Sequence, residues 1–190
     1  MSGSQRQSLA ILGLVSEILI RRIAPSDSAI LRRVRLRALA TDPASFGSTY
    51  EREAAFPDQT WAERAARSAA GDDAATLLAI SGDEPIGIVT AMRNETQKQL
   101  FHVVGRWVAP EARREGIGRG LLNAIEGWIA SCGGTSAHLS VTDAATAAMR
   151  LYASTGYRPD GTSAASRHTP GLTEISLLKQ LHGVDSPASP

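Results

Sequence analysis

Cysteine is almost absent from this sequence. Cys132 is the only one among 190 residues, so no disulfide can form within the chain and no pair of thiols can hold a metal ion. We therefore expect no metal site, and a reducing, cytoplasmic location is consistent with this cysteine content. Cys132 itself is interpreted as a small apolar residue near the end of a helix.

An excess of charge of one sign and long apolar runs are also missing. Twenty Lys and Arg residues balance nineteen Asp and Glu residues, which leaves a formal net charge of +1. Without a global positive field, neither nucleic acid nor a membrane surface is expected as a partner. The apolar run at residues 9–20 is too short to cross a bilayer and contains Glu17, and no small-residue cleavage site follows it.

The composition indicates one globular domain. Hydrophobic residues make up 43% of the chain and charged residues 21%, which is ordinary for a domain with a full core. No internal repeat or low-complexity tract is evident. We predict an N-terminal extension at residues 1–17, a single domain at 18–182 and a flexible tail at 183–190.

Periodicity and turn signals predict six strands and four helices. Residues 41–56 are expected to form a loop or a broken helix. Side-chain caps are expected at Ser26 or Asp27, at Thr60, and at Thr142 or Asp143. The strands are predicted at 18–23, 75–81, 85–93, 100–108, 137–141 and 172–178. The helices are predicted at 28–40, from 59 to about 70, at 144–154, and after the glycine turn, where Gly133 and Gly134 stop the helix.

The most informative segment is residues 108–122, which has the pattern of a strand, a basic glycine-rich turn and a helix. Gly116 and Gly118 lack a Cβ, so the backbone can turn sharply and present several N–H groups to an anion at the positive end of the helix. One apolar face of that helix is formed by Leu121, Leu122, Ile125, Trp128 and Ile129. The segment therefore predicts a phosphate-binding cradle.

Two common phosphate-binding motifs do not fit this turn. The dinucleotide fingerprint G-x-G-x-x-G fails because Gly120 comes one residue too early. The nucleotide P-loop fails because no G-K-[ST] sequence is present here.

The turn instead resembles the acyl-CoA motif of the GCN5-related N-acetyltransferases (GNAT). That motif is [RQ]-x-x-G-x-[GA] after V-x-P, and here Arg113-x-x-Gly116-x-Gly118 follows Val108-x-Pro110. A second family block is matched from Ala148 onward, and the likeness extends over residues 19–181, including the stretch 36–50. The residues of the second block are Ala148, Leu151, Tyr152, Gly156 and Tyr157.

This resemblance implies the fold and the activity. The expected fold is mixed α/β, with a twisted, mostly antiparallel sheet of six or seven strands, splayed between the fourth and fifth strands, and about four helices. The expected activity is transfer of an acetyl group from acetyl-CoA to a primary amine in a ternary complex. A small-molecule acceptor is preferred, because no acidic run near the motifs indicates a groove for a protein substrate.

The resemblance also implies roles for individual residues. A backbone N–H at Trp107 or Val108 would polarise the thioester carbonyl, and the phenol of Tyr152, protonated at neutral pH, would act as the general acid toward the CoA thiolate. The alternative for Tyr152 is a ring packed in the core. Ala145 stands where the family usually has an asparagine that bonds to the CoA arm.

The base and the acceptor pocket are less defined. His102 lies six residues before Val108, where histone-type members place a glutamate. It is a candidate base, since imidazole exchanges protons near neutral pH. In the alternative, His102 has a structural role and the amine loses its proton to ordered water. The candidates for the lining of the acceptor pocket are Phe46, Tyr50, Glu51 and Trp61, and Glu51 would hold an ammonium group. The alternative is that the aromatic residues among them belong to the core.

The CoA phosphates are expected at the glycine turn, mainly on backbone N–H groups rather than guanidinium groups. Two other functions stay open: acetylation of a protein or peptide, and a non-catalytic module that only binds acyl-CoA. The chain is expected to be a monomer or a homodimer. The predicted cofactor-binding residues are Trp107, Val108, Arg113, Arg114, Gly116, Ile117, Gly118 and Arg119.

Overall fold

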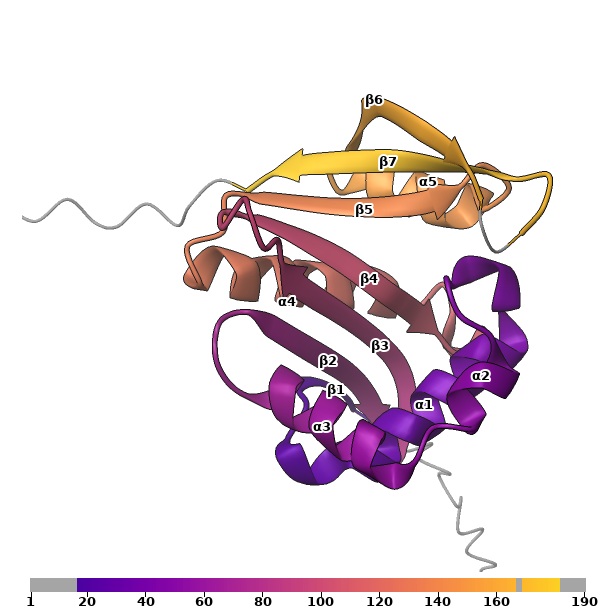
Figure 1. Ribbon diagram of the computed structural model, residues 1–190, viewed down its shortest axis with the longest axis vertical. Coiled ribbons are helices and arrows are strands. Elements are labelled where there is room, and N and C mark those ends of the chain that lie inside the picture. The colour runs from indigo at the N-terminus through magenta and orange to yellow at the C-terminus, as the bar shows by residue number, and fades with distance from the viewer. Residues whose placement is uncertain (1–16, 167–168, 182–190) are drawn as a thin grey trace, which may run out of the picture.

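A computed structural model describes residues 17–166 and 169–181 (Figure 1). Seven strands form one sheet in the order β1-β2-β3-β4-β5-β7-β6, and β4–β5 is its only parallel pair among these residues. The predicted mixed, mostly antiparallel sheet is confirmed. The strands are β1 (Ile18–Arg22), β2 (Ala74–Ser81), β3 (Glu84–Arg93), β4 (Leu100–Val108), β5 (Ser136–Thr142), β6 (Arg158–Ala165) and β7 (Thr173–Gln180).

Helices cover both faces of the sheet (Figure 1). The side opposite α4 is covered by α1 and α3, while α4 packs on β2 and β3 through a stripe of fully buried side chains at Leu121, Leu122, Ile125 and Ile129. About four helices were expected, and the described residues contain five, because the loop after α1 includes one extra turn. The helices are α1 (Ser28–Thr41), α2 (Tyr50–Ala54), α3 (Asp58–Ala69), α4 (Ile117–Ser131) and α5 (Thr146–Ser154).

Strands β4 and β5 pair only at one end. Their ladder has three rungs, which end at His102 opposite His138, and beyond that point the two strands diverge. The predicted splay between the fourth and fifth strands is therefore confirmed. It leaves the edge of β4 that faces β5 without a strand partner over its C-terminal half.

A β-bulge at Gly105 determines which side chains of β4 face which layer. Between its pairings with Thr90 and Ile88, β4 runs three residues from Val104 to Trp107, whereas β3 runs only two, and Gly105 has φ 61°. The extra residue reverses the alternation of faces. Phe101 therefore packs against Trp128 of α4, while Trp107 faces the C-terminal end of α1.

One strand was not predicted, and the predicted side-chain caps do not form. Every residue of β6 is exposed, so its sequence shows no alternation, and it is a strand because it pairs with β7. Asp27 does not cap α1 with its side chain; it accepts hydrogen bonds from Arg21 and from the backbone N–H of Ala24. Likewise, Thr60 lies inside α3, and α5 begins at Thr146 without a side-chain cap.

Most of the predicted N-terminal extension (1–17) and the whole predicted tail (183–190) lie outside the described residues. None of the helices in the described ranges is long and apolar enough to span a membrane.

Candidate functional site

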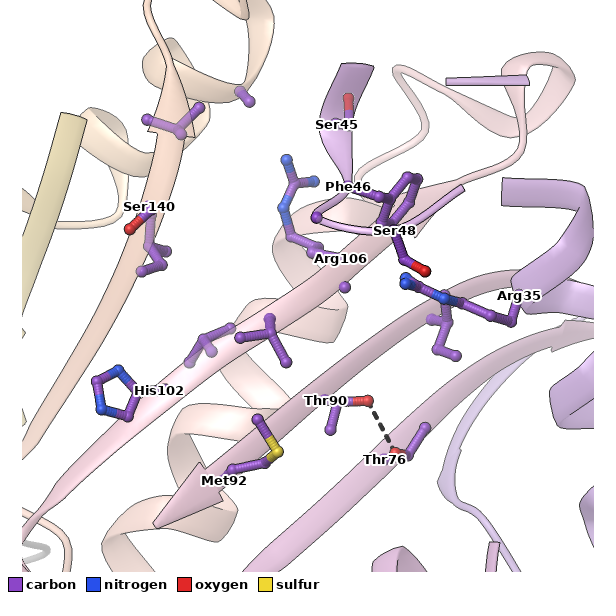
Figure 2. Close-up of a pocket in the computed structure, with 18 of the residues that line it drawn as sticks. Arg35, Ser45, Phe46, Ser48, Thr76, Thr90, Met92, His102, Arg106 and Ser140 are labelled. Carbon is purple, nitrogen blue, oxygen red and sulfur yellow. Dashed lines mark hydrogen bonds between the residues drawn. The ribbon is translucent and has the colours of Figure 1, made fainter. Parts of the chain in front are cut away.

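A cavity of about 710 Å³ lies over the sheet and extends into the gap between β4 and β5. Figure 2 shows side chains from several strands and from the segment around Phe46 and Ser48 pointing into it. Strands β2–β5 contribute residues to one side, and α1–α3 contribute residues to the other. The lining residues include Arg35, Phe46, Glu53, Trp61, Arg64, Thr76, Thr90, His102, Arg106, His138, Tyr152, Glu174 and Ala145, the residue that stands where the family usually has an asparagine.

The predicted phosphate cradle is a turn that opens onto the N-terminus of α4. Gly116 adopts a left-handed conformation with φ 83°, and the first hydrogen bond of the helix runs from the Gly120 N–H to the Gly116 carbonyl. The N–H groups of Ile117, Gly118 and Arg119 therefore have no acceptor within the helix. They are grouped at the positive end of the helix dipole, where an anion binds favourably.

The arginines of this turn have different contacts. Arg113 Nε donates to the carbonyl of Val108 at 3.0 Å, and its guanidinium forms an ion pair with Asp42. Arg119 Nη2 donates to Ser154 Oγ of α5 at 2.9 Å, whereas Arg114 is exposed and has φ 71°. Arg113 thus fixes the turn against β4, which leaves the backbone groups as the principal anion donors.

Only one of the two candidate carbonyl-polarising N–H groups faces the gap. The Ala109 N–H donates to the Ile86 carbonyl at 2.8 Å, and Trp107 is paired with Ile88. Because alternate residues of an antiparallel strand bond to the same neighbour, the Val108 N–H points away from β3 and toward the β5 side. The structure therefore favours the backbone N–H of Val108 over that of Trp107 as the group that would polarise the carbonyl. The indole Nε1 of Trp107 donates to Asp42.

Tyr152 lies beside the gap and lines the cavity. Its side chain is buried, and Arg106 Nε donates to its hydroxyl oxygen at 2.9 Å. The guanidinium carbon of Arg106 also lies 4.9 Å from the centre of the Tyr152 ring. Since the oxygen accepts from Arg106, the phenolic hydrogen is available to another acceptor in the cavity.

His102 belongs to a chain of hydrogen bonds that the sequence analysis did not foresee. Asn94 Oδ1 accepts from donors of residues 96 and 97, so its Nδ2 must donate to His102 Nε2, at 2.9 Å. His102 then carries its proton on Nδ1 and donates to His138 Nδ1 at 3.2 Å. His138 Nε2 in turn faces Asp160 at 3.6 Å.

Both ring nitrogens of His102 are therefore engaged in this arrangement. A base role for His102, which stays a prediction, would require the Asn94 amide to move away from Nε2. The pair also links β4 to β5 at the last rung before the splay. His138 could not be identified from sequence, because its partner lies 36 residues away on another strand.

Acid should weaken the fold through His138. Burial, together with the nearby His102, lowers the pKa of His138 below its ordinary 6.5, and Asp160 opposes this only in part. The unfolded chain then binds the proton more readily, so stability falls as pH decreases below about 6.5 and levels off below the folded-state pKa. In urea titrations at pH 7.5 and 5.5, H138Q should lose less stability on acidification than the wild type.

The D160N variant is the control for His138, because it should change the loss of stability on acidification in the opposite direction to H138Q. Removing the carboxylate takes away the charge that favours protonated His138 and should steepen the loss of stability with acid. Equal pH dependence in H138Q and the wild type would show that His138 does not determine it.

Some of the residues predicted for the acceptor pocket line the cavity, and others do not. Phe46 and Trp61 line it and are buried, whereas Tyr50 and Glu51 are exposed on α2 and do not line it. On α2, the carboxylate that reaches the cavity is Glu53, which sequence reasoning missed. Successive residues of a helix turn by about 100°, so residues 51 and 53 point in nearly opposite directions.

Glu53 is held by two arginines. Its side chain is 3% exposed and accepts from Arg35 Nη2 at 2.7 Å and from Arg64 Nη1 at 3.1 Å. Burial alone would raise the pKa of Glu53. The hydrogen bond and charge of Arg35, a hydrogen bond from Ser48 and the charge of Arg64 outweigh it and bring the pKa below its ordinary value. Glu53 is thus ionised and already paired.

Across residues 17–166 and 169–181, no cluster of three or more His, Cys, Asp or Glu side chains has a geometry that could hold a metal ion.

Comparisons with known proteins agree with this geometry. The model of the acetyltransferase (GNAT) family matches residues 35–157. No curated protein sequence matches the chain.

Solved structures share the fold at low sequence identity. The GNAT-family acetyltransferase from Streptococcus pneumoniae has a TM-score of 0.78 and 19% identity, covering 87% of this chain and 100% of that one. The PaiA N-acetyltransferase from Thermoplasma acidophilum, solved with coenzyme A, has a TM-score of 0.68 and 17% identity, covering 86% and 99%.

The ribosomal-protein-S18-alanine N-acetyltransferase from Escherichia coli has a TM-score of 0.63 and 15% identity, covering 90% of this chain and 99% of that one. These likenesses concern the fold, while the family match spans the glycine turn and the second block. The chain belongs to the acetyltransferase (GNAT) family.

Proposed function

We propose that the protein transfers an acetyl group from acetyl-CoA to a primary amine of a small molecule, by direct transfer with both substrates bound. The observation that carries this proposal is the position of Tyr152. Its hydroxyl is held by Arg106 in the same cavity that extends into the gap between β4 and β5. A proton donor therefore stands beside the unpaired edge of β4.

The residues of the turn fit the cosubstrate. Gly116 and the N–H groups at the start of α4 would hold the pyrophosphate, and the Val108 N–H would donate to the thioester carbonyl. When bound, acetyl-CoA supplies an activated acyl group whose departing thiolate requires a proton. Tyr152 would donate that proton.

The acceptor must lose a proton before or during transfer. Because Asn94 and His138 engage both nitrogens of His102, we assign this proton to water in the cavity. Four arginines and two glutamates line the cavity, so a basic peptide would meet an unfavourable charge there. This balance supports a small-molecule acceptor over a basic protein substrate.

The first test is stabilisation by the cosubstrate. Acetyl-CoA at a hundred times its Kd should stabilise the native state by about 2.7 kcal/mol, a rise of roughly 5–10 °C in Tm for a domain of this size. The variant G118V should lose this rise. A Cβ at Gly118 would lie 3.2 Å from Arg106 Nη1 and 3.4 Å from Leu151 Cδ2, so a larger side chain crowds the start of the cradle.

Gly127 provides the matched control on the same helix. A Cβ there meets nothing within 4 Å, so G127V should keep the full response to acetyl-CoA. The amine acceptors are then screened by release of the CoA thiol. No stabilisation at millimolar acetyl-CoA would contradict the proposed cosubstrate, and stabilisation without thiol release for any amine or peptide would indicate a module that only binds acyl-CoA.

A further inference from the structure

Arg35 is unusually constrained for a cavity side chain. It extends from α1 toward β4, with Phe46 and Ser48 beside its guanidinium (Figure 2). Its Nε and Nη2 donate to the carboxylate of Glu53 at 3.1 and 2.7 Å, and its guanidinium carbon lies 4.6 Å from the centre of the Phe46 ring. An ion pair on one edge and an aromatic face together fix the plane of this guanidinium.

The remaining edge of Arg35 lies beside Gly105 of β4. Its Nη1 makes no hydrogen bond among the described residues, and a Cβ built on Gly105 would lie 3.4 Å from it. Gly105 is the bulge of β4, between the last rung that β4 shares with β5 and the Val108 N–H that faces the gap. An oriented cationic donor therefore lies at the bulge of β4, between the last rung shared with β5 and the Val108 N–H.

The charges around Arg35 leave this donor available to an anion. Glu53 already accepts from both Arg35 and Arg64, so two guanidinium groups share one carboxylate. The other glutamate of the cavity, Glu174, lies on β7 and accepts from Ser166. Arg106 also lines the cavity and has no carboxylate partner in the described part of the chain.

A pair of hydroxyl groups adds a second donor. Thr76 and Thr90, on β2 and β3, lie 2.8 Å apart in the same cavity (Figure 2). Their mutual bond uses one of the two hydroxyl hydrogens and leaves the other free to donate. A guanidinium edge and a hydroxyl are groups that commonly recognise a carboxylate.

We infer that the acceptor is an aminocarboxylate, whose carboxylate is bound by Arg35 Nη1 while its amino group faces the gap between β4 and β5. This inference rests on the proposed function, because it names the acceptor class of the same site. It assigns Arg35 the role of a specificity-determining residue that acts on the acceptor and not on the thioester.

The test compares acids with their own carboxamides. Thiol release is followed with α-, β- and γ-amino acids and with the matching carboxamides, which keep the amine and lose the charge. The wild type should show kcat/KM at least about tenfold higher for the best acid than for its carboxamide, as expected for one charged hydrogen-bonded contact. The carboxamide has the less basic amine, so proton loss alone would favour the opposite order.

The variant R35K separates recognition from packing. Lysine keeps one positive charge for Glu53 but has no second edge, so it should raise KM for the acid about tenfold and lower the kcat/KM ratio between acid and carboxamide. The matched control is R64K, which also weakens the pairing of Glu53 but should preserve the ratio between acid and carboxamide.

Each outcome has a distinct meaning. Absence of thiol release with every amine contradicts the proposed function itself. Equal kcat/KM for acids and carboxamides in the wild type overturns the inference while the proposed function stands, and this comparison needs no folded variant. If R35K and R64K each lower kcat/KM for the acid and for the carboxamide by the same factor, Arg35 only supports Glu53 and the inference is wrong.

Discussion

Replacing Tyr152 by phenylalanine should lower kcat for acetyl transfer at least about 100-fold, the usual contribution of a positioned general acid. The Y152F variant keeps the aromatic ring that packs against Tyr157 and removes only the hydroxyl that Arg106 holds. Binding of acetyl-CoA should change little, because the cradle at the start of α4 is untouched. Thiol release under saturating substrates measures kcat, and thermal shift with acetyl-CoA reports binding.

Tyr157 is the control for this prediction. Its ring centre lies 5.7 Å from that of Tyr152, but Tyr157 is buried outside the cavity, and burial with the nearby Glu126 carboxylate raises the pKa of its phenol. Y157F should therefore keep kcat within about twofold of the wild type, well below the contribution expected of a general acid. If Y152F retains the wild-type kcat, Tyr152 is a packing residue and the thiolate takes its proton from elsewhere.

Replacing Glu53 by glutamine should destabilise the fold by about 3–5 kcal/mol, because it removes one partner of a buried ion pair. Arg35 and Arg64 would then be held close together without the carboxylate that they share. For a domain of this size the expected decrease in Tm is roughly 6–20 °C. Urea and thermal unfolding at pH 7 give the free energy and the Tm.

Glu63 is the matched control, since it is exposed on α3 and accepts only from Gln59 among the described contacts. E63Q should change stability by less than about 0.5 kcal/mol. If E53Q lowers the free energy of unfolding by less than about 1 kcal/mol, Glu53 and its two arginines behave like an exposed ion pair whose charges are screened by solvent.

The glycine turn was predictable because its signals are local. Positive φ at Gly116, the start of α4 and the apolar stripe of that helix all follow from about fifteen consecutive residues. The bulge at Gly105 has a local signal too, because a glycine stands inside an apolar strand there. Backbone conformation and helix periodicity depend on near neighbours, so the sequence displays them directly.

The site itself was predicted only in part. Tyr152 and Phe46 line the cavity, Tyr50 and Glu51 do not, and Glu53 takes the interior position on α2. A short helix offers two faces, and only packing against α1 and α3 decides which carboxylate is buried. The strand β6 was missed for a related reason, since its partner β7 supplies the pairing that its own residues do not signal.

By itself, the sequence determined the family, the glycine turn at the start of α4 and the presence of a tyrosine on the helix after β5, because each depends on residue types at fixed local spacing. The tertiary structure decided the rest. It placed His138 opposite His102, turned Val108 toward the gap and set Arg35 between Glu53 and Gly105. These relations join residues that are distant in sequence, and they exist only once the strands and helices have packed.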